Sequence, residues 1–227
     1  MTGYLSKTST CKLLYKPLQR GFCDKINTLR PAYFASFAVD ITLALQRNPM
    51  LSYTYVDNSN VFIEAQRVSA IEKGMAVDLY DAIDRRVFDW SYKLDYGKLY
   101  EYLCGDEQEV GCAKLWGSPP PSDSFWKMVE RKGFEVKTYD RSLSGKEKKV
   151  DVAIAHAMTK DAYTKIDKAN AEIVLVAGDK DYMPVIEDLK SEGFRVVVVF
   201  WDHAAQEVKQ AATKFISLNQ WLNYLQL

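Results

Sequence analysis

Four aspartates at three points of the sequence carry its strongest chemical signal. Asp57 follows an apolar, β-rich run, Asp179 and Asp181 follow a second such run, and Asp151 opens a segment with helical spacing. In a parallel sheet these three places lie along one edge, where carboxylates repel each other unless a cation neutralises them. The pattern indicates a divalent-metal site, and phosphodiester hydrolysis is the chemistry that such a site would support.

Each aspartate also has a simpler interpretation. An aspartate after a strand commonly caps a helix or closes a turn, which would account for Asp57. Asp151 would likewise serve as the N-cap of a helix that begins at Val152. The turn at 178–182 is harder to explain in this way, because its glycine permits a tight turn from which two carboxylates emerge.

The expected cofactor is Mg²⁺ or Mn²⁺, which prefers carboxylate and water oxygens and uses few protein ligands. A metal-bound water would attack the phosphorus, and the metal would stabilise charge on the leaving oxygen. Near Asp57, the side chain of Asn60 is placed to orient a carboxylate or a phosphate oxygen, and Ser59 offers a hydroxyl.

Strand-like and helical segments alternate along the chain. Runs of apolar, β-branched or alternating residues predict strands at 51–56, 110–116, 134–139, 172–177, 195–200 and 215–218. Helical spacing predicts helices at 60–73, 77–88, 94–103, 125–132, 152–166, 184–192 and 206–213, and a closing helix after 218. This alternation predicts a three-layer α/β/α fold with a central parallel sheet, which binds ligands beyond the carboxyl ends of its strands.

Composition narrows the function classes. The formal net charge of the 227 residues is zero, so nucleic-acid binding would need a local basic patch. No apolar run reaches the roughly 18 residues of a spanning helix, and we expect no membrane partner. The four cysteines are Cys11, Cys23, Cys104 and Cys112. Their spacing is not that of metal ligands, so we expect them to be free thiols in a reducing compartment, the cytoplasm.

The first fifty residues differ from the rest in charge, with seven basic residues against two acidic ones. We therefore predict two parts: a basic N-terminal extension at 1–50 and a domain at 51–227. The extension is either an accessory segment, with a helix at 32–45 packing on the domain, or an organelle-targeting peptide.

A series of motifs resembles the NYN domain, a branch of the PIN-like nucleases, over about residues 50–222. The motifs are VDNSN at 56–60, GSPP at 117–120, RKGFEV at 131–136, KVDVAI at 149–154 and LVAGDKDYMPV at 175–185. The resemblance implies a five- or six-stranded parallel sheet and a Mg²⁺/Mn²⁺ site that cleaves RNA. By position, Asp57, Asp151, Asp179 and Asp181 match the family's acidic catalytic and metal-binding residues, and Asn60 matches its asparagine.

Two positions depart from the family pattern. Bacterial members often carry a further aspartate six residues after the one that matches Asp151, and Ala157 occupies that place here. A serine or threonine commonly precedes the Gly-Asp step, where this chain has Ala177. Either change would weaken metal binding or slow turnover, which leaves open a catalytically weakened or inactive domain that acts as an RNA-binding scaffold.

Basic and aromatic residues near the aspartates suggest how RNA would be held. Four basic residues shortly before Asp151 in the sequence are predicted to contact backbone phosphates; they are Arg141, Lys146, Lys148 and Lys149. Trp116 and Tyr182 flank the expected edge loops, where they would either stack on unpaired bases of single-stranded RNA or belong to the core. Self-association, the RNA target and endo- versus exonuclease action stay open.

Other phosphate chemistries fit less well. A haloacid-dehalogenase-like phosphatase needs a second aspartate two residues after its nucleophile, and Ser59 stands there. A dinucleotide-binding module would need a G-x-G-x-x-G sequence after a strand, and no predicted strand is followed by one.

Overall fold

The computed structural model describes residues 50–105, 110–118, 122–139 and 148–227. The basic segment 1–49, with its expected helix, lies outside the described residues. So do two of the predicted phosphate-binding residues, Arg141 and Lys146, and two cysteines, Cys11 and Cys23.

The centre of the domain is a six-stranded sheet in the order β3-β2-β1-β4-β5-β6. Every neighbouring pair of strands is parallel. The strands are β1 (Leu51–Asp57), β2 (Val110–Gly117), β3 (Glu135–Thr138), β4 (Ala171–Val176), β5 (Val196–Phe200) and β6 (Lys214–Ser217). The chain builds outward from β1 in one direction and then returns to add β4 on its other side. The order therefore reverses between β1 and β4, where parallel sheets open a crevice for ligands.

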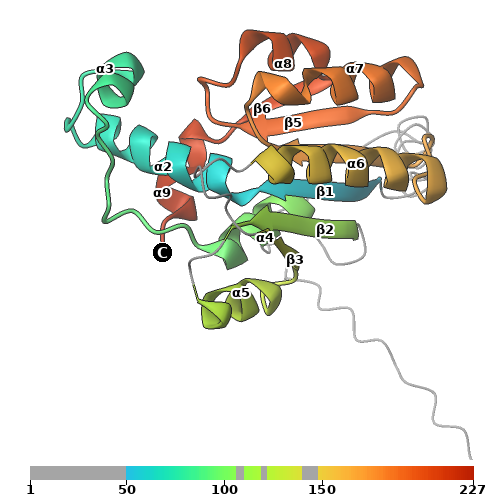
Figure 1. The fold of residues 1–227 in the computed structure, drawn as a ribbon, viewed down its shortest axis with the longest axis horizontal. Helices are drawn as coiled ribbons and strands as arrows, with labels where there is room; N and C mark the ends of the chain where they lie inside the picture. Colours follow the sequence, from blue (N-terminus) through green and yellow to red (C-terminus); the bar gives the residue numbers. More distant parts are fainter. Residues whose placement is uncertain (1–49, 106–109, 119–121, 140–147) are drawn as a thin grey trace, which may run out of the picture. The chain divides into compact units, whose positions relative to one another are not determined.

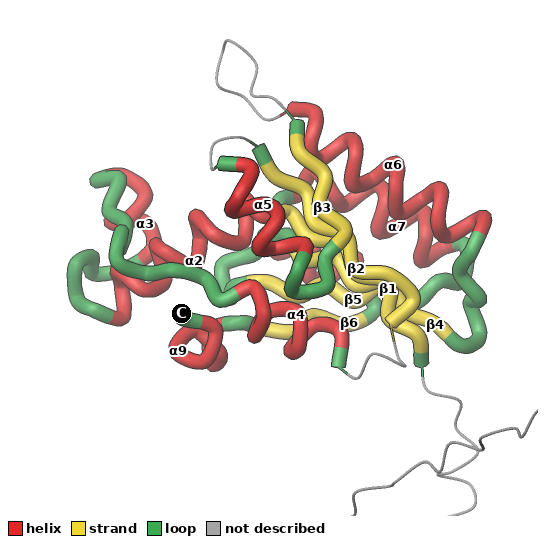
Figure 2. The backbone as a smooth tube through the Cα atoms, turned by 90° about the horizontal axis from the view of Figure 1, so that it is seen from below, coloured by secondary structure: helices red, strands yellow, loops and turns green. Residues whose placement is uncertain are grey.

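Helices cover both faces of this sheet, as Figures 1 and 2 show. The helices that do so are α2 (Asn58–Glu72), α4 (Tyr96–Cys104), α5 (Asp123–Glu130), α6 (Lys148–Thr164), α7 (Met183–Ser191), α8 (Gln206–Ala211) and α9 (Leu222–Leu225). A short helix, α3 (Leu79–Asp84), packs on α2, and two 3₁₀ turns are η3 (Lys180–Tyr182) and η4 (Asn219–Trp221). One apolar core holds side chains of α2, α4, α5 and α9, and the other holds those of α6, α7 and α8. The predicted three-layer α/β/α architecture is confirmed.

Alternating residues of each strand supply the two cores. In β4, Val174 and Val176 belong to the core under α2, whereas Ile173 and Leu175 belong to the core under α6. Successive side chains of a strand point to opposite faces, so a strand buried on both faces must be apolar throughout. This explains why the nearly continuous apolar runs in the sequence were reliable strand signals.

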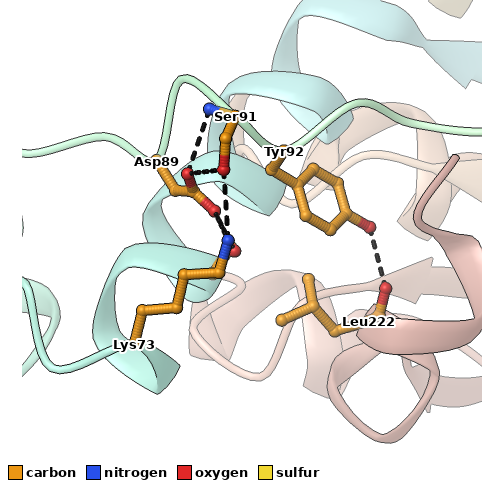
Figure 3. Close-up of polar contacts among 6 residues, drawn as sticks. Lys73, Asp89, Ser91, Tyr92 and Leu222 are labelled. Atoms are coloured by element: carbon orange, nitrogen blue, oxygen red, sulfur yellow. Dashed lines mark hydrogen bonds and ion pairs between the residues drawn. The ribbon is translucent and has the colours of Figure 1, made fainter.

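A buried polar cluster fixes the chain between α3 and α4 (Figure 3). Asp89, 4% exposed, accepts hydrogen bonds from Ser69 and Lys73, both at 2.6 Å, and from the backbone and side chain of Ser91. One step along the chain, the Tyr92 hydroxyl donates to the carbonyl oxygen of Leu222 at 3.0 Å. These bonds tie an irregular segment to α2 on one side and to the C-terminal turn on the other.

The predicted helix at 77–88 is shorter than expected. The structure forms only α3, because Asp78 caps it at one end and Arg86, with φ of 54°, lies outside the helical region at the other. The spacing of Leu79, Ile83 and Val87 did not mark a buried face, because Ile83 is 43% exposed and the other two are only half-buried. Among the described residues, no helix combines the length and apolar character needed to cross a bilayer.

Candidate metal centre

Asp57 ends β1 and begins α2, and its two carboxylate oxygens have different partners. Oδ1 accepts the backbone N–H of Asn60 at 3.1 Å, which makes Asp57 the N-cap of α2. Oδ2 accepts the hydroxyl of Tyr182 at 3.1 Å, and the residue is only 5% exposed. The capping interpretation of Asp57 is confirmed, yet capping occupies one oxygen and leaves the other directed at a tyrosine from a distant turn.

Asp151 lies in the first turn of α6. The helix begins at Lys148, so the alternative in which Asp151 caps a helix starting at Val152 was wrong. A carboxylate in the first turn is stabilised by the positive end of the helix dipole. Its Oδ1 accepts the same Tyr182 hydroxyl at 3.3 Å, so the aspartates of β1 and α6 meet at one phenol.

Tyr182 belongs to η3, and its hydroxyl stands between these carboxylates. Burial and the negative charges of Asp57 and Asp151 hold the pKa of Tyr182 far above its usual value. The phenol therefore stays protonated and shares its single hydrogen between two acceptors. The ring is 1% exposed, which excludes the predicted stacking of Tyr182 on RNA bases.

The turn after β4 carries the other two aspartates in more open positions. Asp179 caps η3 by accepting the backbone N–H of Asp181 at 3.1 Å. Both residues are exposed, and Asp181 lines a shallow depression together with Pro184 and Glu207. The structure thus brings Asp57 and Asp151 to one hydroxyl and leaves Asp179 and Asp181 at the solvent-facing turn beside it.

Asn60 connects the two turns at the point where strand order reverses. Its side-chain oxygen accepts the backbone N–H of Gly178 at 3.1 Å. Gly178 is required here because a Cβ on it would lie 2.1 Å from Cδ1 of Phe200. The sequence placed Asn60 near the site, and the structure gives it a positioning role between β1 and β4.

The donor set suits a hard divalent cation that takes few protein ligands. Mg²⁺ is typically held by one or two carboxylates and by substrate phosphates and waters, which matches the pair Asp57 and Asp151. A closed cage is not built: among the described residues, no three His, Cys, Asp or Glu side chains are close enough to hold a metal. Ser118, which directly follows β2, has a buried hydroxyl with no hydrogen-bond partner among the described residues.

The remaining predicted site residues have mixed outcomes. Trp116 is 1% exposed in β2 and stacks on Tyr55, with ring centroids 6.1 Å apart, so its predicted stacking on RNA bases is wrong and the core interpretation holds. In a sheet covered by helices on both faces, aromatic side chains of the strands pack in the core and are not available to a ligand. Ser59 is half-buried in the first turn of α2. Lys148 and Lys149 begin α6, beside Asp151.

Sequence reasoning missed two features of this region. The hydroxyl of Tyr182 was not expected to join the aspartates, although an aromatic three residues after Asp179 was the available signal. Ser118 was quoted only as part of a motif, and nothing in its sequence context marks a buried hydroxyl.

Comparison with known proteins gives a family match and similarities to solved structures. The model of the family described as "NYN domain" matches residues 55–219. No curated protein matches the sequence. A protein of unknown function from Vibrio parahaemolyticus is similar in fold, with a TM-score of 0.55 and 17% identity, over 80% of this chain and 99% of its own.

A reductase domain from an aureusimine biosynthetic cluster aligns over 77% of this chain and 41% of its own, at 9% identity and a TM-score of 0.23, too low to carry an argument. The family match spans most of the domain and includes Asp57, Asn60, Asp151, Asp179 and Asp181. The chain therefore belongs to the NYN domain family.

Proposed function

We propose that this chain is a Mg²⁺- or Mn²⁺-dependent ribonuclease that hydrolyses phosphodiester bonds of RNA at the Asp57–Asp151 pair. The observation that carries the proposal is the convergence of two carboxylates on the Tyr182 hydroxyl, at 3.1 and 3.3 Å, beside the point where strand order reverses. Membership of a PIN-like nuclease family supports it, as does the placement of the pair at the carboxyl edge of the sheet.

In this proposal Asp57 and Asp151 hold the cation, and the exposed Asp179 and Asp181 add negative charge at the opening of the site. A divalent cation bound there would supply an activated water and would neutralise charge on the phosphate. Tyr182 orients both carboxylates, and Asn60 holds the turns of β1 and β4 together. We assign residues 51–227 to this domain and residues 1–50 to an N-terminal extension.

A second function has one specific observation in its favour. Asp57 and Asp179 both cap helical turns, and the described residues contain no preformed three-carboxylate cluster. An NYN domain that binds RNA without cleaving it would need these aspartates only as helix caps. The two functions separate on metal dependence, because binding by a scaffold would persist in a chelator while cleavage would not.

The test uses labelled single-stranded RNA with Mn²⁺ or Mg²⁺, comparing wild type with Asp57→Asn and Asp151→Asn. Asparagine caps a helix about as well as aspartate, so Asp57→Asn keeps the turn of α2 and removes only the charge. We expect each variant to lose at least a hundredfold in cleavage rate. Asp188→Asn, at an exposed position of α7, is the matched control and should cleave like wild type.

Cleavage that persists in EDTA, or that survives both substitutions, would refute the metal-dependent ribonuclease. Wild type that binds RNA equally with and without metal, and cleaves none of a range of RNAs, would select the scaffold function.

A further inference from the structure

The face of the sheet under α6 is open at one edge. In that layer α6, α7 and α8 contribute to the core, and a cavity of about 270 Å³ lies where β2 and β3 extend beyond α6. Lys114 of β2 and Lys137 of β3 form part of its floor, and Lys160 of α6 forms part of its wall. Lys165, just after α6, closes the far end. We call this cavity the lysine groove.

The groove is positively charged although the chain as a whole is neutral. Among the described residues that line it, four lysines stand against two carboxylates, those of Glu135 and Asp161, which leaves an excess of two positive charges in this part of the lining. Cations gathered in a concave surface raise the local concentration of anionic ligands.

One carboxylate of the groove is fully committed to the protein itself. Asp161, 2% exposed, accepts the Tyr55 hydroxyl at 2.9 Å and pairs with both Lys114 and Lys165, the latter at 3.1 Å. Burial acts to raise the pKa of Asp161, but the hydrogen bonds from Lys114, Tyr55 and Lys165 outweigh it and the pKa falls. Asp161 is therefore ionised, and two lysines share its one negative charge.

The other two lysines of the groove are Lys160 and Lys137. Lys160 is exposed on α6. The Lys137 side chain is 40% exposed, its ammonium lies 5.6 Å from the centroid of the Trp116 ring, and it pairs with the exposed Glu135 at 3.2 Å. Exposed ion pairs of this kind are weak, so Lys137 can turn to a phosphate at little cost. Tyr139, half-buried at the end of the floor, adds a ring on which a base can stack.

The lysine groove extends from the candidate metal centre. Asp151 is in the first turn of α6, and Lys160 is nine residues further along the same helix, about 14 Å at 1.5 Å per residue. Trp116, part of the groove lining, is the register partner of Asp57 across β1 and β2. Because Lys160 is also about 180° around α6 from Asp151, a nucleic-acid strand bound at the carboxylate pair reaches these lysines by crossing from Asp57 of β1 to Trp116 of β2.

We propose that the lysine groove binds the phosphate backbone of single-stranded RNA on one side of the bond to be cleaved. The choice of RNA as occupant rests on the proposed function. Lysine ammonium groups contact phosphate oxygens without reading sequence, so the groove contributes affinity and direction to the strand. A purely structural role would explain Lys114 and Asp161 but leaves the exposed Lys160 and Lys137 without a purpose.

The experiment measures binding of a labelled, single-stranded oligouridine to the full chain in EDTA, by fluorescence anisotropy. Variants are Lys160→Gln, Lys137→Gln and the double substitution; Lys114 is avoided because its loss would take from the buried Asp161 its buried ion-pair partner. For a single strand, the logarithm of the binding constant falls with the logarithm of the salt concentration by about 0.7 per phosphate contact. At 0.15 M salt we therefore expect each single substitution to weaken RNA binding about fourfold, and the double substitution about fifteenfold. The slope itself should fall by about 0.7 per lysine.

Lys127→Gln is the matched control, because Lys127 is exposed on α5, which packs against the opposite face. It should bind RNA like wild type and keep the full salt slope. Thermal unfolding of all variants should be unchanged, which separates lost binding from lost folding. Equal affinity for wild type and the double variant, or undetectable binding by wild type, would overturn the proposal.

Competition with unlabelled ligands shows whether a nucleic-acid strand is what occupies the lysine groove. An unlabelled tetranucleotide should displace the probe from wild type, whereas uridine monophosphate should compete at least tenfold more weakly. Equal competition by the mononucleotide would overturn the assignment to a strand. Because EDTA removes any metal, loss of binding in the lysine variants supports the groove even if the wild type proves unable to cleave RNA.

Discussion

Asn60 accepts a hydrogen bond from the backbone N–H of Gly178 at 3.1 Å, although 118 residues separate the two in sequence. Asn60 belongs to the first turn of α2 and Gly178 follows β4, so this bond joins the two turns at the point where strand order reverses. Through its own N–H, Asn60 also holds Oδ1 of Asp57. One amide side chain therefore positions the turn that carries Asp57 against the turn that carries Asp179.

Substitution of Asn60 by alanine should destabilise the domain. The N–H of Gly178 is buried, and an unsatisfied buried donor costs about 1 to 3 kcal/mol. We expect a loss of that size in the free energy of unfolding, measured by urea denaturation. Ser59→Ala, one residue earlier, should change it by less than about 0.5 kcal/mol. Equal stability of Asn60→Ala and wild type would contradict the role of this bond.

Removal of the Tyr182 hydroxyl should weaken metal binding. In Tyr182→Phe the ring still fills its buried position, but Asp57 and Asp151 lose the donor that orients both of them. Loss of a hydrogen bond that supports metal ligands typically costs 10- to 100-fold in affinity, and we expect this for Mn²⁺ by calorimetric titration. Tyr224→Phe, at a position 39% exposed, should bind Mn²⁺ normally. Unchanged or tighter binding by Tyr182→Phe would show that the hydroxyl competes with the cation.

Asp89 should make stability depend on acid pH. Burial acts to raise its pKa, but hydrogen bonds from Lys73, Ser69 and Ser91 outweigh it and hold the pKa well below its usual range (Figure 3). A depressed pKa means that the ionised group stabilises the fold above the unfolded-state pKa of about 4. This contribution is lost as the pH falls through the folded-state pKa.

Asp89→Asn tests this linkage. The amide group places an N–H donor where the carboxylate accepted hydrogen bonds, and we expect a loss of about 1 to 3 kcal/mol at pH 7. The gap between wild type and variant should narrow below about pH 4, because Asp89 of the unfolded wild type then takes up a proton while Asp89 of the folded protein stays ionised. Asp84→Asn, exposed at the end of α3, controls for the loss of one carboxylate. A gap that stays constant from pH 7 to pH 2 would refute the assignment.

The strands could be predicted from the sequence because the sheet is buried on both faces. The run at 195–200 became β5 almost unchanged, since its residues pack into two cores. The helix at 77–88 was overestimated because Ile83 is exposed and Leu79 and Val87 are only half-buried, so the apolar spacing there reflects no buried face. The spacing of apolar residues therefore predicts secondary structure well where an element is buried on both faces, and poorly where it lies exposed at the edge of the domain.

The part of the candidate site that lies at the ends of strands could be predicted from the sequence. A parallel sheet puts the residues after β1 and β4 on one edge, so Asp57 and the turn of Asp179 were placed together by topology alone. The position of Tyr182 depends on how η3 packs, and its place in the sequence left both stacking on RNA bases and a role in the core open. The lysine groove joins Lys114 to Lys160 across 46 residues of sequence, and only the packing of α6 on β2 brings them together.

Ala157→Asp separates the two regions of the site. The substitution introduces the aspartate that bacterial members of the family often carry at the matching position. Here Ala157 lines the lysine groove, six residues beyond Asp151, which is about 9 Å along α6 and about 240° around it. A carboxylate at 157 therefore lies among cations rather than beside the Asp57–Asp151 pair. We expect Mn²⁺ affinity within about twofold of wild type, and single-stranded RNA binding about fourfold weaker, as for one lost phosphate contact.

Ala155→Asp is the control for added charge on the same helix, because Ala155 is half-buried on α6 and does not line the groove. If net charge alone weakened RNA binding, both variants would lose affinity equally. A loss confined to Ala157→Asp locates the strand in the groove, because only there does the new carboxylate meet the phosphates. Mn²⁺ binding tightened tenfold or more by Ala157→Asp would instead mean that α6 supplies a third ligand, and the metal centre would then extend into the groove.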